Sequence, residues 1–189
     1  MADDAVASFT VMVTGEVESA EIPGQDNAYC KYQLVHGEDW HLVSGIQDAI
    51  SQTCRSAPVD GNMRLVWNFP VDATFKSYNP FGWPQIVLSV YGVDGMGREV
   101  VQGYGCTHVP VTPGQHAVKV RLFRPASSSG IQAFMAWLMG QRPEFNDPLF
   151  PASSEGREVT RVQSEGFATV RLNIATKGMA QFGFDTGAD

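Results

Sequence analysis

The chain has 189 residues, a net charge of −7 at pH 7, a hydrophobic fraction of 43% and an aromatic fraction of 11%. A chain of this length and apolar content can bury a core, which excludes global disorder and favours a single domain. The negative charge and the lack of a Lys/Arg cluster argue against nucleic acid as a partner. No apolar run approaches the ~20 residues that a membrane-spanning helix needs.

Charge and cysteine usage indicate a surface with few charged residues and a reducing environment. The charged fraction of 17% lies below the usual ~25%, which favours a protein that works inside an assembly. The acidic start, Met1 to Asp4, lacks the apolar run of a signal peptide. The three cysteines, Cys30, Cys54 and Cys106, are odd in number and widely spaced. We therefore expect free thiols in the cytoplasm.

The first part of the chain predicts two strands after a flexible start at 1–7. From Phe9 to Val17, apolar and polar residues alternate with the period of a strand that is buried on one face. A turn rich in Gly, Pro and Asn follows at 21–27. The segment Cys30–Leu34 then alternates in the same way. We expect these two strands to pair with each other in antiparallel fashion.

The middle of the chain carries the strongest strand pattern. Apolar residues occupy every odd position from 65 to 75, and Pro70 within this run predicts a local edge, bulge or bend. The segment 86–91 is almost entirely apolar, which is typical of a central strand covered on both faces. We expect the turn at 79–84 to join these two strands as a hairpin. Glycines at 103–105 predict a further bulge or a close backbone approach.

The rest of the chain predicts one helix and the last strands. Alternating segments occur at 118–122 and 168–174, and residues 131–139 have apolar side chains at helical spacing. The Gly-rich tail, 179–189, is either frayed or draped over the domain. We therefore expect an all-β fold: an antiparallel β-sandwich of about eight strands with one short helical insertion at 131–139, in a single domain spanning 8–178.

No motif for catalysis, cofactor binding or metal binding is present. The glycines near residues 92–97 lack the strand–glycine–helix context of a dinucleotide site, and turn chemistry explains them. The four histidines are dispersed, which argues against zinc. Asp60, Asp72 and Asp94 lack the close pairing that calcium requires. A catalytic triad could still assemble in space, yet no nucleophile motif occurs. We expect a non-enzymatic protein without a cofactor.

Five large apolar residues are candidates for protein interaction. Phe81 and Trp83 lie at the tip of a turn, and Phe134, Trp137 and Met139 lie on the expected helix, which has no charged residue. An exposed apolar patch usually marks an interaction site. Two interpretations stay open for both groups: contact with a partner or a membrane surface, or packing inside the core.

Several long motifs resemble the B9 domain family. The main one is FKSYNPFGWPQIVLSVYG at 75–92, and similar segments follow at 101–105, 140–148, 155–162 and 176–187. The resemblance spans nearly the whole chain and implies a C2-like β-sandwich. One departure lies in the expected hairpin after the first motif, where Gly-Met-Gly-Arg replaces an aromatic-Gly-Asn-Asp turn and makes the loop less acidic.

The resemblance implies a scaffold component of the ciliary transition zone, the gate at the base of the cilium. Its implied partners are the other B9 domain proteins, in a heteromeric complex within the Meckel-syndrome-associated assembly, which includes transmembrane proteins. The implied role is ciliogenesis and control of membrane-protein entry, at the cytoskeleton of the basal body and transition zone. The alternative is a C2-like module that binds membrane lipid weakly and without calcium, because aspartate clusters are absent.

Overall fold

The computed structural model describes residues 8–93, 97–125 and 162–184 of the chain. Within this part, eleven strands and one short 3-10 helix are present. They are β1 (Phe9–Glu21), β2 (Asn27–Val35), β3 (Trp40–Gly45), β4 (Asp48–Ile50), β5 (Cys54–Arg55), β6 (Ala57–Val59), β7 (Asn62–Ser77), β8 (Gln85–Val93), β9 (Glu99–His108), β10 (Gly114–Pro125), β11 (Val162–Lys177) and η2 (Ala180–Phe182).

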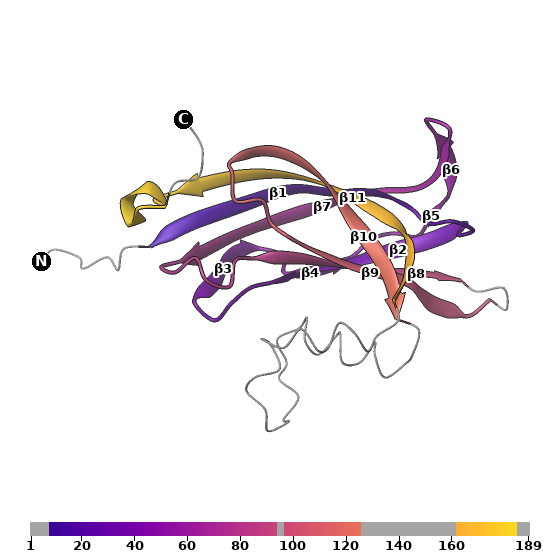
Figure 1. Ribbon diagram of the computed structural model, residues 1–189, viewed down its shortest axis with the longest axis horizontal. Coiled ribbons are helices and arrows are strands. Elements are labelled where there is room, and N and C mark those ends of the chain that lie inside the picture. Colours follow the sequence, from indigo (N-terminus) through magenta and orange to yellow (C-terminus); the bar gives the residue numbers. More distant parts are fainter. Residues whose placement is uncertain (1–7, 94–96, 126–161, 185–189) are drawn as a thin grey trace, which may run out of the picture.

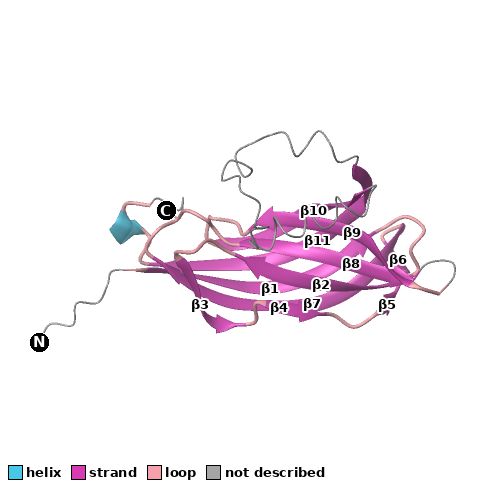
Figure 2. Cartoon of the chain, turned by 90° about the horizontal axis from the view of Figure 1, so that it is seen from below, coloured by secondary structure: helices cyan, strands magenta, loops and turns pink. Residues whose placement is uncertain are grey.

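The strands form one antiparallel sheet that curls into two facing layers. Their order is β3-β7-β1-β11-β10-β9-β8-β2-β4, with β5 on β2 and β6 on β7. The sheet turns the corner between β10 and β9, which are joined by the pair Phe123 and Tyr104. The layers lie face to face with the core between them (Figures 1 and 2). The expected all-β antiparallel sandwich is confirmed, while the expected helix at 131–139 lies outside the described residues.

The core follows the predicted alternation. In β7, Leu65, Trp67 and Phe75 are buried, whereas Val66 and Asp72 between them are exposed. Residues 86–90 of β8, which lies between β2 and β9, are all buried, so side chains on both faces of this strand are covered, as predicted. Burial of each large apolar side chain contributes roughly 1.5–3 kcal/mol, so this pattern is the main driving force of the fold.

Pro70 lies where β7 has an open edge, as predicted. β3 pairs with residues 73–77 of β7, and β6 pairs with residues 62–64. The register between β7 and β1 also shifts between Phe69 and Val66, next to Pro70. Proline has no N–H to donate to a neighbouring strand, so it is tolerated in this open and irregular stretch of β7.

The predicted bulge in β9 is also confirmed. Val90 of β8 pairs with Gly103, and the next residue pairs with Val101, so Gln102 has no partner in the ladder with β8. A Cβ atom at Gly105 would lie 2.8 Å from the backbone oxygen of Arg121. Only glycine allows β9 and β10 to approach so closely at the corner of the sheet.

Two predicted pairings are wrong. β1 pairs with β7 and β11, not with β2, and β2 pairs with β8. The segment 79–84 does not close a hairpin, because β7 and β8 lie in different layers and the chain crosses between them. Alternation reports which face of a strand is buried and says nothing about its neighbour, since both layers present apolar faces to the same core.

The segment from β3 to β6 connects the two layers by pairing first with one and then with the other. β3 lies beside β7, β4 and β5 lie beside β2, and β6 returns to β7. At the first crossing, the Ile46 amide donates to the Asp72 oxygen (2.9 Å) and the Leu34 amide donates to the Gln47 oxygen (2.7 Å). Residues 46–55 contain the two short strands β4 and β5.

Candidate interaction site

The turn between β7 and β8 is organised by the carboxylate of Asp39. Tyr78 donates its hydroxyl proton to Oδ1 (2.6 Å), and the Asn79 side-chain amide donates to Oδ2 (2.7 Å). The Ser77 hydroxyl lies 2.8 Å from the Asp39 backbone oxygen. The bonds from Tyr78 and Asn79 stabilise the charged carboxylate and hold the pKa of Asp39 below its usual value. The hydrogen bond between Tyr78 and Asp39 also raises the pKa of Tyr78.

The backbone around Phe81 is fixed on both sides. Its amide donates to Oδ1 of Asn79 (3.0 Å), and the indole Nε1 of Trp40 donates to its carbonyl oxygen (3.0 Å). One residue further on, the Gly37 amide donates to the Gly82 oxygen (2.8 Å). The Phe81 side chain is nevertheless 82% exposed. The turn therefore presents an aromatic ring to solvent from an ordered backbone.

A contact between two glycines makes this geometry possible. Gly82 has φ +73°, and a Cβ atom there would lie 2.6 Å from the Cα atom of Gly37. A Cβ atom at Gly37 would lie 2.9 Å from the Cα atom of Gly82. Both positions therefore exclude side chains, and glycine at both brings the β2–β3 connection against the β7–β8 turn.

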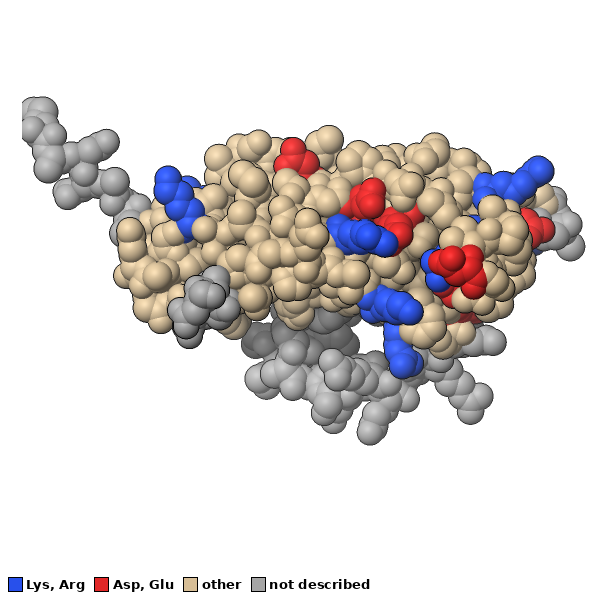
Figure 3. Space-filling view, turned by 90° about the horizontal axis from the view of Figure 1, so that it is seen from above, with Lys and Arg blue, Asp and Glu red and all other residues tan. Residues whose placement is uncertain are grey.

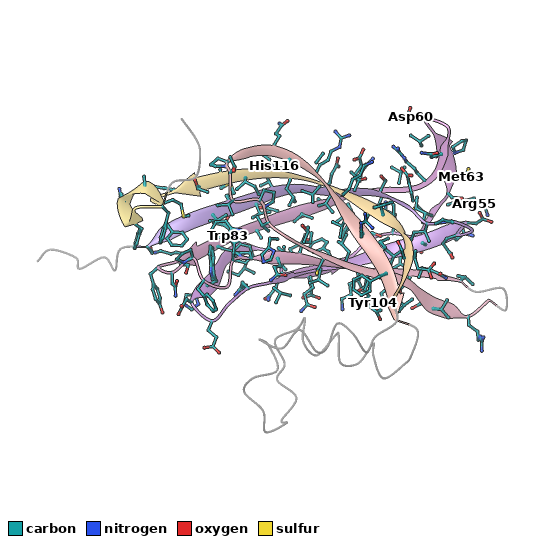
Figure 4. All side chains as sticks on the ribbon, viewed as in Figure 1. Arg55, Asp60, Met63, Trp83, Tyr104 and His116 are labelled. Carbon is teal, nitrogen blue, oxygen red and sulfur yellow. The ribbon has the colours of Figure 1, made fainter. Side chains whose placement is uncertain are left out.

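Trp83 lies against the core instead of projecting. Its Nε1 donates to the Val109 oxygen (2.8 Å), and its ring meets Trp40 edge-on, with centroids 5.0 Å apart. Figure 4 places it toward the end of the sandwich away from Asp60. Of the two candidate residues in the turn, Phe81 is available for contact and Trp83 holds the turn in place.

Sequence reasoning missed Asp39 and Trp40. Trp40 is 1% exposed, and its ring also packs edge-on against Phe9, with centroids 5.4 Å apart. The available signal was the order Gly37, Glu38, Asp39, Trp40, a turn with a carboxylate directly before an aromatic residue. Because these residues lie about 40 positions before Phe81, spacing alone could not connect them to it.

Phe134, Trp137 and Met139 lie outside the described residues, so their role stays a prediction. Within the described part of the chain, His, Cys, Asp and Glu form no group of three that could hold a metal ion. No helix there has the length and hydropathy of a membrane span.

The three thiols are free, and burial raises the pKa of Cys30 to about 12. Burial also raises the pKa of Cys54 and of Cys106. Such thiols stay protonated at neutral pH and are weak nucleophiles.

Comparison with known proteins places this fold in a family. The family model described as "B9-C2: Ciliary basal body-associated, B9 protein" matches residues 11–175. B9 domain-containing protein 1 from Mus musculus and from Homo sapiens is 52% identical to the chain over 187 residues, covering 99% of this chain and 91% of each relative. B9 domain-containing protein 2 from Rattus norvegicus is 33% identical over 165 residues, covering 87% of this chain and 90% of that protein.

Among solved structures, the C2A domain of plant Extended Synaptotagmin 1 aligns with a TM-score of 0.42 and 15% identity, over 87% of this chain and 92% of that one. The family match runs from β1 to β11 and takes in the Phe81 turn, and its description pairs B9 with C2, in agreement with the sandwich. The chain belongs to the B9 family of ciliary basal body-associated proteins.

Proposed function

We propose that this chain is a non-enzymatic scaffold subunit at the base of the cilium, in the basal body and transition zone. It acts by assembling with other B9 domain proteins, and through them with transmembrane proteins of the transition zone. In this role it supports ciliogenesis and the gating of membrane-protein entry. Membership of a basal body-associated family supports the location, and the exposed Phe81 on its fixed turn supports the mode of action.

Phe81 has the properties of an interface anchor. Binding normally costs free energy because interface groups must be immobilised, and a backbone that is already held by hydrogen bonds reduces that cost. Aromatic side chains that enter a partner's pocket carry much of the binding energy of protein interfaces. A ring that is 82% exposed on such a turn therefore favours docking to another protein.

The surrounding surface also favours a protein partner. The outer face of the layer that contains β1, β7 and β11 carries scattered charges on a mostly neutral surface (Figure 3). Low charge density lowers the desolvation cost of a protein contact. Glu38 is exposed beside the turn, and Asp39 is held ionised within it, so the rim of the site disfavours anionic lipid.

One observation favours the alternative, a lipid-binding module. Lys76 and Lys177 are exposed and both pair with Thr10, so they lie in one row across the sheet next to the Phe81 turn. Each lysine near an anionic membrane contributes about 1 kcal/mol of attraction. The carboxylates of Glu38 and Asp39 offset this attraction, which is why the protein partner is preferred.

Co-expression with B9 domain-containing protein 2 from Mus musculus, 33% identical to this chain, tests the proposal. We expect a stable stoichiometric complex, and Phe81→Ala should weaken it by about 2 kcal/mol, the size of an interface hot spot. Phe167→Ala is the matched control, because this phenylalanine is 41% exposed on β11. A chain that stays monomeric beside this protein at physiological salt contradicts the scaffold function. Flotation with anionic vesicles that is lost in Lys76→Glu/Lys177→Glu supports the lipid alternative instead.

A further inference from the structure

β3 forms an open edge of the sheet. It stands at one end of the strand order and pairs with β7 on one side only. Among the described residues, no backbone group of 41–45 hydrogen-bonds to a segment on its other side. The outward N–H and C=O groups of this strand are therefore available to another extended chain.

Exposed aliphatic side chains accompany this edge. Val43 on β3 is 61% exposed, and Ile46, directly after the strand, is 58% exposed. Between residues 42 and 50, Asp48 is the only charged residue, and Lys, Arg and Pro are absent. Lysine and proline are residues that protect a strand edge from pairing, and this edge has neither.

Other strand edges in the described part of the chain are shorter, are partly covered, or carry proline or charged residues. β4, at the opposite end of the strand order, has only three residues. Part of β7 is covered by β6, a three-residue strand that contains Pro58. β9 and β10 pair with each other at the corner through the single pair Phe123 and Tyr104, and β10 carries Lys119 and Arg121, charged residues of the kind that protect an edge. β3 has six residues, although a bulge leaves Val43 without a partner on β7. A bulge increases twist and limits an added strand to about the length of β3.

The edge is continuous with the Phe81 turn. β3 begins at Trp40, whose indole binds the Phe81 carbonyl, and Asp39 directly before it binds Tyr78 and Asn79. A partner that takes the Phe81 ring into a pocket is thereby placed at the start of the open strand.

We propose that β3 pairs with an edge strand of the partner B9 domain protein, and that the Phe81 turn anchors one end of this intermolecular sheet. The inference rests on the proposed function, because it takes another B9 domain protein as the partner. An extended backbone can pair with the whole row of N–H and C=O groups along an open strand, which a lipid headgroup cannot do. The matching strand carries aliphatic side chains toward Val43 and Ile46.

Two variants of the full chain test this in complex with the Mus musculus B9 domain-containing protein 2. Val43→Lys/Ile46→Lys places two cations on the edge, at side chains that are already exposed and so leave folding intact. Met63→Lys is the matched control, because Met63 is 56% exposed on the hairpin of β6 and β7, at the far end (Figure 4). We expect the double variant to bind about tenfold more weakly or worse, and the control to bind like the wild type.

Amide hydrogen exchange separates strand pairing from simple surface contact. In the wild-type complex, the amides of residues 41–45 that point away from β7 should exchange more slowly than in the free chain. If the wild type binds, but the double variant binds equally well and these amides exchange as in the free chain, the strand pairing is overturned and the scaffold function stands. If the wild type does not bind at all, both proposals fall.

Discussion

At the level of single residues, Asp39 explains how the Phe81 side chain can be exposed to solvent while its backbone is held by hydrogen bonds. Its carboxylate accepts from Tyr78 and Asn79, and Asn79 in turn accepts from the Phe81 amide. Because the folded-state pKa of Asp39 lies below its unfolded value, its contribution to stability is present above the unfolded pKa. That contribution is lost as the pH falls through the folded value, so the turn is held in place at neutral pH.

Gly82 is the residue whose replacement should disturb the turn most. Gly82→Ala adds strain at φ +73° and a Cβ atom 2.6 Å from the Gly37 backbone. Gly24→Ala is a matched control, because Gly24 has φ +74° and nothing within 4 Å of an added Cβ atom. We expect Gly24→Ala to lower the free energy of unfolding by about 1 kcal/mol, and Gly82→Ala by at least about 1 kcal/mol more. Urea denaturation measures both, and equal losses would show that the two backbones do not meet.

At the level of elements, the sequence was sufficient to predict which residues are buried and insufficient to predict which strands pair. The alternation of β7 and the apolar run of β8 predicted which residues are buried, and Pro70 predicted a local edge. The partners of these strands come from distant parts of the chain, which a local pattern cannot report. The site shows the same limit: Phe81 was predicted at a turn tip, whereas the Asp39 that fixes it became visible only in three dimensions.

The segment after β11 is, we propose, an integral part of the domain. Met179 is 5% exposed, and the rings of Phe182 and Phe184 meet Phe9 edge-on at 5.6 and 5.8 Å. Phe182→Ala should lower the free energy of unfolding by about 1–3 kcal/mol, less than for a fully buried phenylalanine, because this ring is half-buried. Gln181→Ala, at an exposed neighbour, should stay within about 0.5 kcal/mol of the wild type. An unchanged urea midpoint in Phe182→Ala would mean that the segment merely rests on the surface.

At the level of the whole molecule, both termini of the described chain meet in one layer. β1 pairs along its length with β11, so Thr10 lies opposite Lys177. The buried residues of both layers form one hydrophobic cluster. The segment from β3 to β6 ties the open side of the sandwich to β7 and β2. No layer can separate without exposing the apolar face of the other, which couples the folding of all strands.

Unfolding should therefore be a single cooperative transition in spite of the corner between β9 and β10. Trp40 and Trp83 report one end of the sandwich, while Trp67 donates its Nε1 to the Ala28 oxygen and reports the contact between β7 and β2. In the variants Trp67→Phe/Trp137→Phe and Trp40→Phe/Trp83→Phe/Trp137→Phe, the remaining indoles report different regions. In each variant, the urea midpoint from fluorescence should coincide with that from far-UV circular dichroism, as expected for a two-state domain. Separate midpoints would show that the two layers unfold independently. The contacts of the segment from β3 to β6 would then be too weak to couple them.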